Sequence, residues 1–272
     1  MMRPVEPVRP AAGYIGGKRQ LARRLTALIE GAPHEVYAEA FVGMGGVFLR
    51  RQLAPRVEVI NDRAQDVATF FRILQRHYEA LMDMLKWRLT SRADFERLRA
   101  QDPDTLTDLE RAARFLYLQK LSFGGKVAGR SFGMQTTGPA RFDTARLGPV
   151  LEAIHARLSG VTIECLDWRD FMARWDRAGT LFYLDPPYYG TEHYYGAGLF
   201  AQADYADLIA CLRGLKGRFI LTINDCPETR ALFGHFQIET AELSYTAAGA
   251  GSAVAARELI VMGPVRRARR GR

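Results

Sequence analysis

The stretch Val36-Tyr-Ala-Glu-Ala-Phe-Val-Gly-Met-Gly-Gly46 decides the fold that we expect for this chain. Its first part, Val36–Phe41, is a run of mostly apolar residues that predicts a β-strand. The glycines that follow permit a tight turn in which a ligand can approach the backbone closely. The turn lacks the third glycine of a dinucleotide-binding fingerprint, because Phe48 stands in its place. By itself, the turn fits either a cofactor site or simple packing of the strand against the next segment.

An acidic residue ends the next predicted strand, Val57–Asn61. Asp62 comes roughly 20 residues after the glycine turn, the spacing at which an acid reaches the ribose of a bound nucleotide. Its carboxylate can accept hydrogen bonds from both ribose hydroxyls. The glycine turn, the strand and the terminal acid together predict a site for a nucleoside cofactor, and the missing glycine favours a cofactor without a pyrophosphate.

The rest of the chain repeats a pattern of strands and helices. Five further apolar runs predict strands, and helical stripes lie between many of them. These strands are Val161–Cys165, Thr180–Leu184, Phe219–Ile223, Phe236–Leu243 and Glu258–Met262, and the stripes are Leu21/Leu25/Leu28, Val67/Phe70/Phe71/Leu74 and Leu208/Leu212/Leu215. The alternation predicts an α/β fold whose sheet of about seven strands is mostly parallel and covered on both faces. The last two strands lack a helix between them, so we expect the Gly-, Ala- and Ser-rich segment 244–256 to join an antiparallel hairpin.

One stretch, residues 77–160, interrupts this rhythm because it reads as helical and then as rich in loops. Thr105 and Asp108 have the spacing of a capping box at the start of a helix. We therefore predict a sheet domain made of residues 1–76 and 161–265 and a second, mainly helical domain inserted at 77–160. Residues 266–272 form a basic tail.

Composition narrows the class of partner. The chain has 272 residues, 48% of them hydrophobic, and a formal net charge of +8, so it can bury a core and suits an acidic partner such as nucleic acid or anionic lipid. Five of the cations lie in the tail, which is expected to be either a solvated end or a non-specific phosphate contact. The three cysteines form no C-x-x-C pair, which argues against a disulfide framework or a structural zinc site. No apolar run approaches the length of a membrane span and no secretory h-region is present, so a cytoplasmic protein is expected.

The tetrapeptide Asp185-Pro-Pro-Tyr188 follows the predicted strand Thr180–Leu184. Proline fixes φ and has no N–H, and Pro186 keeps Asp185 extended. The Asp185 carboxylate and the Pro186 carbonyl can then face one point as two acceptors, which suits an exocyclic amino group with two donors. Tyr188 supplies a flat face on which a ring can stack. A bare Asp-Pro-Pro also occurs as a rigid surface turn, but here it ends a strand in a chain that already carries a nucleoside-site pattern.

At these motifs the chain resembles the DPPY-type N6-adenine DNA methyltransferases, the bacterial and phage DNA adenine methylase family. The resemblance covers most of the chain and depends on four motifs in the family's order. They are Gly16-Gly17-Lys18, Phe41-x-Gly43-x-Gly45, Asn61-Asp62 and the Asp185–Tyr188 tetrapeptide. The first of them lacks the spacing of a phosphate-binding P-loop, which excludes that interpretation.

The resemblance implies a Rossmann-like methyltransferase sheet and S-adenosyl-L-methionine as cofactor. It places the cofactor over the glycine turn with its ribose on Asp62, and Lys18 near both cofactor and target. Asp167 and Trp168 resemble the segment that contacts the cofactor's adenine, although a tryptophan there also suits a core. The cofactor-binding residues implied are Gly16, Lys18, Phe41, Gly43, Gly45, Asp62, Asp167, Trp168 and Asp185.

The resemblance also implies double-stranded DNA as the substrate, read by the inserted domain. The DNA-binding candidates are Lys18, Lys120, Lys126, Arg130, Arg141, Tyr194 and Tyr195. Cations in the insert are also common as plain surface charges, and the run Glu192–Tyr195 fits either a base pocket or an ordinary surface loop. A monomer is favoured.

The chemistry implied is direct methyl transfer to adenine N6, with Asp185, Pro186, Pro187 and Tyr188 as catalytic residues. The N6 lone pair is delocalised into the ring, so hydrogen bonds to Asp185 and Pro186 would localise it for in-line attack on the sulfonium methyl. The base must leave the duplex, and Tyr188 would stack on it. This route requires neither a metal nor a covalent intermediate.

Other functions stay open at this stage. A cytosine-C5 methyltransferase needs a cysteine nucleophile, which usually follows proline, whereas here the order is Cys226-Pro227 and the Asp185–Tyr188 tetrapeptide has no role in that chemistry. A cytosine-N4 methyltransferase shares the amino-group chemistry but more often has serine at the position of Asp185. An RNA substrate would use the same tetrapeptide, and a non-catalytic DNA-binding module would need no intact cofactor motifs.

Overall fold

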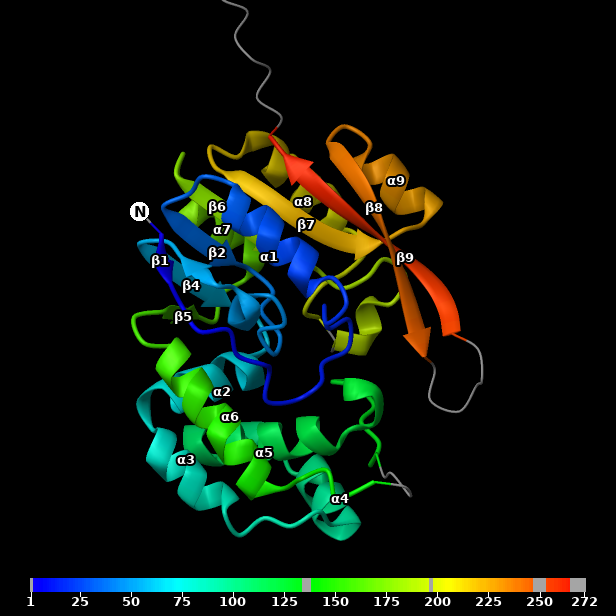
Figure 1. Ribbon diagram of the computed structural model, residues 1–272. Helices are drawn as coiled ribbons and strands as arrows, with labels where there is room; N and C mark the ends of the chain where they lie inside the picture. Colours follow the sequence, from blue (N-terminus) through cyan, green and yellow to red (C-terminus); the bar gives the residue numbers. More distant parts are fainter. Residues whose placement is uncertain (1, 134–137, 196–197, 247–252, 265–272) are drawn as a thin grey trace, which may run out of the picture.

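A computed structural model describes residues 2–133, 138–195, 198–246 and 253–264, and its centre is a seven-stranded sheet in the order β5-β4-β2-β6-β7-β9-β8 (Figure 1). The strands are β2 (Val36–Glu39), β4 (Val57–Asn61), β5 (Thr162–Glu164), β6 (Thr180–Leu184), β7 (Arg218–Asn224), β8 (Gln237–Thr246) and β9 (Ala253–Gly263). The first five in sheet order run parallel, while β9 is antiparallel to both β7 and β8. The predicted α/β class and mostly parallel sheet are therefore confirmed. A small separate sheet pairs β1 (Arg3–Pro4) with β3 (Leu53–Ala54).

Helices cover both faces of the sheet, as the sequence pattern predicts. On one face α7 (Trp168–Trp175), α8 (Asp204–Gly214) and α9 (Pro227–Phe233) bury Phe171, Leu208 and Phe233. On the other face α1 (Ala22–Gly31) and α2 (Gln65–Arg76) bury Leu25, Ile29 and Phe70. The two apolar layers hold the sheet between them, because a parallel sheet must exclude water from both faces.

The hairpin of the last two strands is confirmed, but its predicted linker is too long. Pairing between β8 and β9 continues to Thr246 opposite Ala253, so both ends of the predicted linker 244–256 belong to the ladder. The small residues there gave no strand signal, because that signal comes from apolar and β-branched side chains. The pairing itself is made by backbone hydrogen bonds, which form whatever the side chain. The tip of the hairpin lies outside the described residues.

The stretch that breaks the sheet pattern is mainly helical. It comprises α3 (Tyr78–Leu85), α4 (Arg92–Ala100), α5 (Asp108–Leu121) and α6 (Thr144–Arg157), with short 3₁₀ turns at Pro103–Thr105 and Phe123–Gly125. The other 3₁₀ turns of the described chain are Phe48–Arg50 and Glu192–Tyr195. Helix α5 packs against α2 (Figure 1). One buried apolar cluster contains side chains of α1, α2, α5 and α6. A separate folding domain at 77–160 therefore stays a prediction.

The capping box of α5 lies two residues further along the chain than the sequence predicted. The prediction at Thr105 and Asp108 is wrong, because Thr105 belongs to a 3₁₀ turn that Asp102 caps. The true box is Thr107 and Glu110: the Thr107 side chain accepts from the Glu110 amide, and the Glu110 carboxylate accepts from the Thr107 amide at 2.9 Å.

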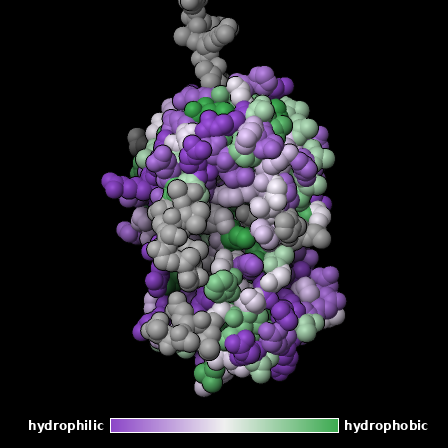
Figure 2. Space-filling view, turned by 90° about the vertical axis from the view of Figure 1, so that its right-hand side faces the viewer, coloured by the Kyte–Doolittle hydropathy of each residue, from purple (hydrophilic) through white to green (hydrophobic). Residues whose placement is uncertain are grey.

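Among the described residues, no helix is long and apolar enough to cross a membrane. The face seen in Figure 2, which is the right-hand side of Figure 1, carries mostly hydrophilic side chains with small, separate hydrophobic patches between them.

Candidate active site

A cavity of about 760 Å³ lies where β2, β4 and β6 end. Such a volume is typical of small-molecule sites, which span roughly 300–1,000 Å³. Parallel strands bring their carboxyl ends to one edge of the sheet, which is why motifs far apart in the sequence meet here. Seven of the predicted cofactor-binding residues line the cavity: Gly16, Lys18, Phe41, Gly43, Asp62, Trp168 and Asp185.

The glycine turn needs glycine at two positions. Gly43 and Gly45 both have positive φ, +49° and +75°, which favours glycine. A Cβ on Gly43 would come within 2.9 Å of the Tyr14 ring, and one on Gly45 within 2.9 Å of Leu49 Cγ. Gly43 borders the cavity. Gly45 faces Leu49 and Phe71 of the core, so it shapes the turn without lining the cavity.

Asp62 connects the end of β4 to this turn. Its Oδ2 accepts a hydrogen bond from the Gly43 amide at 2.9 Å, and its Oδ1 accepts one from the Ala64 amide at 2.9 Å. Burial raises the pKa of the Asp62 carboxyl to about 6, while both amides act in the opposite direction. Each carboxylate oxygen has a second lone pair, so Asp62 can hold the turn and still accept from hydroxyls in the cavity.

Aromatic side chains line the part of the cavity next to Asp62. Phe41 and Phe200 meet edge to face with ring centroids 5.9 Å apart, and Trp168 is 6.4 Å from Phe200. Trp168 is 1% exposed, so it belongs both to the core and to the cavity wall. Asn61 fixes this corner, because its Nδ2 donates to the Ala40 and Leu166 carbonyls and its Oδ1 accepts from the Leu166 amide. The result is an aromatic wall on this part of the cavity, beside the polar side chains of Asn61 and Asp62.

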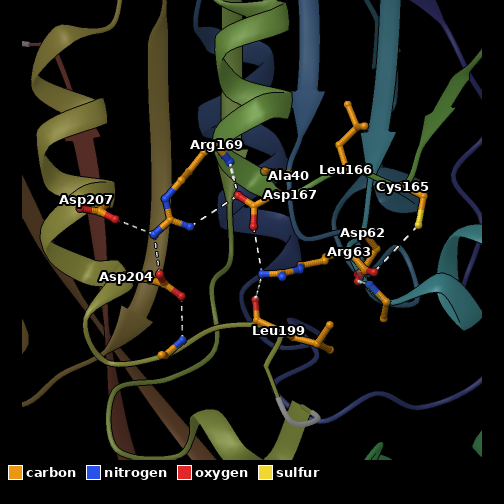
Figure 3. A network of polar contacts seen from close by, with 12 residues as sticks. Ala40, Asp62, Arg63, Cys165, Leu166, Asp167, Arg169, Leu199, Asp204 and Asp207 are labelled. Carbon is orange, nitrogen blue, oxygen red and sulfur yellow. Dashed lines mark hydrogen bonds and ion pairs between the residues drawn. The ribbon is translucent and has the colours of Figure 1, made fainter.

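Asp167 is engaged elsewhere and does not line the cavity. Its carboxylate caps α7 by accepting from the Arg169 amide at 2.9 Å, and it pairs with Arg63 at 2.9 Å (Figure 3). Arg63 in turn donates to the Leu199 carbonyl, and Arg169 pairs with Asp204 and Asp207 of α8. This network joins the wall of the cavity to α7 and α8, and a direct role of Asp167 toward a cofactor stays a prediction.

The Asp-Pro-Pro-Tyr turn leaves β6 at the other part of the cavity. Asp185 Oδ1 accepts from Lys18 Nζ at 2.7 Å and from Thr222 Oγ1 at 2.9 Å. Among the described residues, no contact engages Asp185 Oδ2 or the Pro186 carbonyl, whereas the Pro187 carbonyl accepts from the Tyr205 hydroxyl. Burial raises the pKa of the Asp185 carboxyl to about 6; the charge of Glu258 adds to this and Lys18 opposes it.

Lys18 joins the N-terminal loop to this turn. It is 4% exposed, and its Nζ donates to the Gly16 carbonyl at 2.8 Å and to the Tyr188 hydroxyl at 3.0 Å in addition to Asp185. The ammonium lies 4.8 Å from the centre of the Tyr188 ring. The Tyr188 hydroxyl donates to Glu258, so two motifs predicted from the sequence share one polar cluster with an acid from β9.

Two of the predicted DNA-binding cations lie at the rim of the same cavity. Lys120 Nζ donates to the Ala11 carbonyl at 3.1 Å, and Arg141 Nη1 donates to the Gly133 carbonyl at 3.2 Å. Burial first, and then the charges of Arg9 and Arg141, lower the pKa of Lys120. Among the described residues, Arg9, Lys120 and Arg141 form no ion pair with a carboxylate, so this end of the cavity is electropositive.

Apart from Lys18, which lines the cavity, the remaining DNA-binding candidates whose side chains the structure describes lie away from the cavity wall. Arg130 is half-buried against α5, where it donates to Gln119 at 3.2 Å and packs over Phe115. Lys126 is half-buried in the loop after α5. Tyr194 is 39% exposed, and its carbonyl accepts from the Ala128 amide, which joins the loops after α5 and β6. The Tyr195 side chain and the arginine tail lie outside the described residues.

Sequence reasoning missed three residues of the site. Glu258 completes the cluster around Lys18, Thr222 holds Asp185, and Tyr14 packs on Gly43. Glu258 left a signal, because it is a lone acid in a strand whose alternate residues Ile260 and Met262 face the core. Thr222 and Tyr14 left none, since both are ordinary in their local pattern.

Fold and cavity together define an enzyme of the Rossmann-like α/β class with its site at the carboxyl ends of the strands. Residues 14–247 match the family model of the D12 class N6 adenine-specific DNA methyltransferases. The chain therefore belongs to this family and is a DNA adenine methyltransferase, which uses a methyl donor and acts on DNA.

Two curated proteins show similarity along most of the chain. The type II methyltransferase M1.LlaDCHI of Lactococcus lactis subsp. cremoris is 28% identical over 258 residues, covering 88% of this chain and 89% of the relative. The type II methyltransferase M.CviBI of Paramecium bursaria Chlorella virus NC1A is 21% identical, covering 83% and 86%. A solved precorrin 8w decarboxylase of Methanobacterium thermoautotrophicum is 14% identical, covers 90% of each chain and has a TM-score of 0.38, a similarity too low to support any inference.

Proposed function

We propose that the enzyme transfers a methyl group from S-adenosyl-L-methionine to N6 of an adenine that has left the DNA double helix. The observation that carries this proposal is the position of Asp185 at the edge of the cavity, with Oδ1 held by Lys18 and Thr222. Oδ2 is then left to accept from an amino group. Fixing one oxygen orients the other, which is what a reaction governed by positioning requires.

The cavity fits the proposed cofactor. Asp62 offers spare lone pairs to ribose hydroxyls, and Phe41, Trp168 and Phe200 offer apolar faces to a purine. Gly43 borders the cavity, and the Tyr14 ring packs where a Cβ at this position would stand. When bound, this cofactor supplies an electrophilic methyl group on a sulfonium. Asp185 and the proposed cofactor-binding residues line one cavity, so Asp185 would hold the target base close to the bound cofactor.

Asp185 and Pro186 would act on the target amino group. Two acceptors on one nitrogen draw its hydrogens away from the ring plane and localise the lone pair for attack. The nitrogen gains positive charge as the new bond forms, and the Asp185 carboxylate stabilises that charge and can take the proton that N6 must lose. Tyr188 would stack on the base, which pays part of the cost of its extrusion from the duplex.

We expect the turnover number to depend on the ionisation of Asp185. Burial raises the pKa of this carboxyl from 3.8 to about 6, so below that pH the protonated acid would donate a hydrogen bond where it should accept one. At saturating cofactor and DNA, kcat should therefore fall about tenfold for each pH unit below about 6. The cofactor must be saturating because the pKa of Asp62 is also raised to about 6, so cofactor binding would change in the same pH range. An acidic limb near the ordinary aspartate range would contradict this assignment of Asp185.

We expect Lys120→Ala to weaken DNA binding by removing one phosphate contact. The Lys120 ammonium is half-buried among cations without a carboxylate partner in the described chain, so an anion would relieve its repulsion. The slope of log K against log salt should decrease in magnitude by about 0.9. Arg97→Ala is the matched control, because Arg97 is 71% exposed, is paired with Asp94 and does not line the cavity. An unchanged slope together with weaker cofactor binding would assign Lys120 to the cofactor instead.

The similarity to two type II methyltransferases supports a site-specific enzyme, and we infer a role in a restriction–modification system of a bacterium or a virus. Expression in a methylase-free host, followed by modification-sensitive single-molecule sequencing of plasmid DNA, tests this role. Methylated adenines should occur in one short recurring sequence. Methylation scattered over unrelated sequences would contradict a site-specific enzyme.

A further inference from the structure

A buried acid on β9 completes the cluster around Lys18. Glu258 is 2% exposed and lies opposite Asn224 of β7 and Ala241 of β8. Its side chain is on the same face of β9 as Ile260, which packs in the apolar core. An ionised side chain in such a place costs free energy unless it is well paired. Glu258 also lies beyond residue 247, where the match to the family model ends.

Hydrogen bonds connect Glu258 to Asp185 in three steps. The Tyr188 hydroxyl donates to Glu258 Oε1 and accepts from Lys18 Nζ at 3.0 Å. Lys18 Nζ also donates to Asp185 Oδ1 at 2.7 Å and to the Gly16 carbonyl at 2.8 Å, which uses all three of its N–H groups. Glu258 Oε2 lies 3.7 Å from the same ammonium. The acid therefore holds the far end of the Tyr188 ring and one side of Lys18.

We propose that Glu258 is a positioning residue for methyl transfer, which fixes the Tyr188 ring against the target base and holds Lys18 on Asp185 Oδ1. The proposal rests on the function proposed above. The hydrogen bond at the hydroxyl restricts rotation of the Tyr188 side chain. The plane on which the base stacks is therefore fixed before the base binds. The Lys18 ammonium donates to the Tyr188 hydroxyl and to Asp185 Oδ1, so Asp185 Oδ2 is left as the acceptor for the amino group.

The charge of Glu258 also acts on Asp185. The groups that face Asp185 are Lys18 from the N-terminal loop, Glu258 from β9, Glu39 from β2, Tyr183 from β6 and Thr222 from β7. Of these, the carboxylate of Glu258 raises the pKa of Asp185 and Lys18 lowers it. Loss of the negative charge at position 258 should therefore shift the acidic limb of kcat to lower pH. A side chain that merely filled space would leave this limb unchanged.

A double-mutant cycle tests the proposal. Tyr188→Phe removes the hydroxyl and keeps the ring, and Glu258→Met removes the acceptor at similar volume. Each change should lower kcat about 10- to 100-fold, with KM for the cofactor unchanged, because a small displacement of a reacting group has effects of this size. Both changes remove the same hydrogen bond, so their effects should not multiply. The kcat of the double variant should lie within about threefold of the kcat of the slower single variant. The proposal would be overturned if the loss of kcat in the double variant equalled the product of the two single losses, or if Glu258→Met were fully active.

Two further variants keep the test decisive. Glu258→Gln retains an acceptor for Tyr188 and a polar fit, so it should keep more activity than Glu258→Met while moving the acidic limb to lower pH. If Glu258→Met does not fold, an unmoved limb and unchanged kcat in Glu258→Gln would overturn the proposal by themselves. Glu239→Gln is the matched control, because this acid of β8 makes a surface pair with Arg24 and should have no effect. A wild-type enzyme that transfers no methyl group to adenine would instead refute the proposed function.

Discussion

Replacement of Asp185 by alanine is expected to abolish methyl transfer while leaving DNA binding nearly intact. The variant loses the carboxylate that would orient the target amino group, stabilise its positive charge and take its proton. Loss of one preorganised polar group at a reacting centre costs about 100- to 1,000-fold, and Asp185 would perform several roles at once. We therefore expect a fall in kcat of at least about 1,000-fold. Single-turnover transfer and DNA anisotropy, measured on the same preparation, check both parts.

Two controls separate chemistry from folding. Asp185→Asn keeps the shape of the side chain but has a single acceptor oxygen, which can serve either Lys18 or the amino group and not both. It should therefore fold normally and still lose most of the activity. Asp207→Ala removes a carboxylate of α8 that is 63% exposed and pairs with Arg169, and it should be fully active. Residual activity of Asp185→Ala within about tenfold of wild type would show that another group orients the target.

Replacement of Asp62 by alanine is expected to weaken cofactor binding about 10- to 100-fold. A hydrogen bond to a charged group contributes about 1.5–3 kcal/mol, and about 1.4 kcal/mol corresponds to a factor of ten. The alanine variant loses the proposed ribose contact and also frees the Gly43 amide that shapes the turn. Equilibrium dialysis with S-adenosyl-L-methionine measures the change, and an unchanged Kd would remove Asp62 from the site.

A cofactor analogue without one ribose hydroxyl distinguishes the two roles of Asp62. Wild-type enzyme should bind the deoxy analogue more weakly than the natural cofactor, whereas Asp62→Ala should bind both with similar affinity. If wild type does not discriminate between them, Asp62 acts only by holding the turn. Asp170→Ala, which changes an exposed acid on α7, serves as the control and should bind as wild type does.

The sheet could be predicted because its strands are short apolar runs with clear ends. The predicted limits of the two strands Val57–Asn61 and Thr180–Leu184 agree with β4 and β6. Helix α6 gave no such signal, because Gly148 and Pro149 read as loop residues inside it. Its buried side chains Leu147, Leu151 and Ile154 stabilise the helix through tertiary packing, which a local pattern does not reveal.

The candidate site could be predicted only where a motif brought its parts together. The acids at the ends of β4 and β6 meet because parallel strands end at one edge, which the pattern of alternating strands and helices implies. Glu258 could not be placed, because β9 inserts between β7 and β8 and nothing in the local sequence fixes that order. Asp167 matches the expected motif, yet its carboxylate is taken up by Arg63 and the start of α7.

The central claim is that this chain moves a methyl group from S-adenosyl-L-methionine to adenine N6 in DNA. The most direct measurement incubates double-stranded DNA with the enzyme and methyl-labelled cofactor, digests the DNA to nucleosides and identifies the labelled product. Wild type should yield labelled N6-methyldeoxyadenosine as the single labelled nucleoside, and Asp185→Ala should yield none. Label in N4- or C5-methyldeoxycytidine, or labelling that persists in Asp185→Ala, would contradict the account.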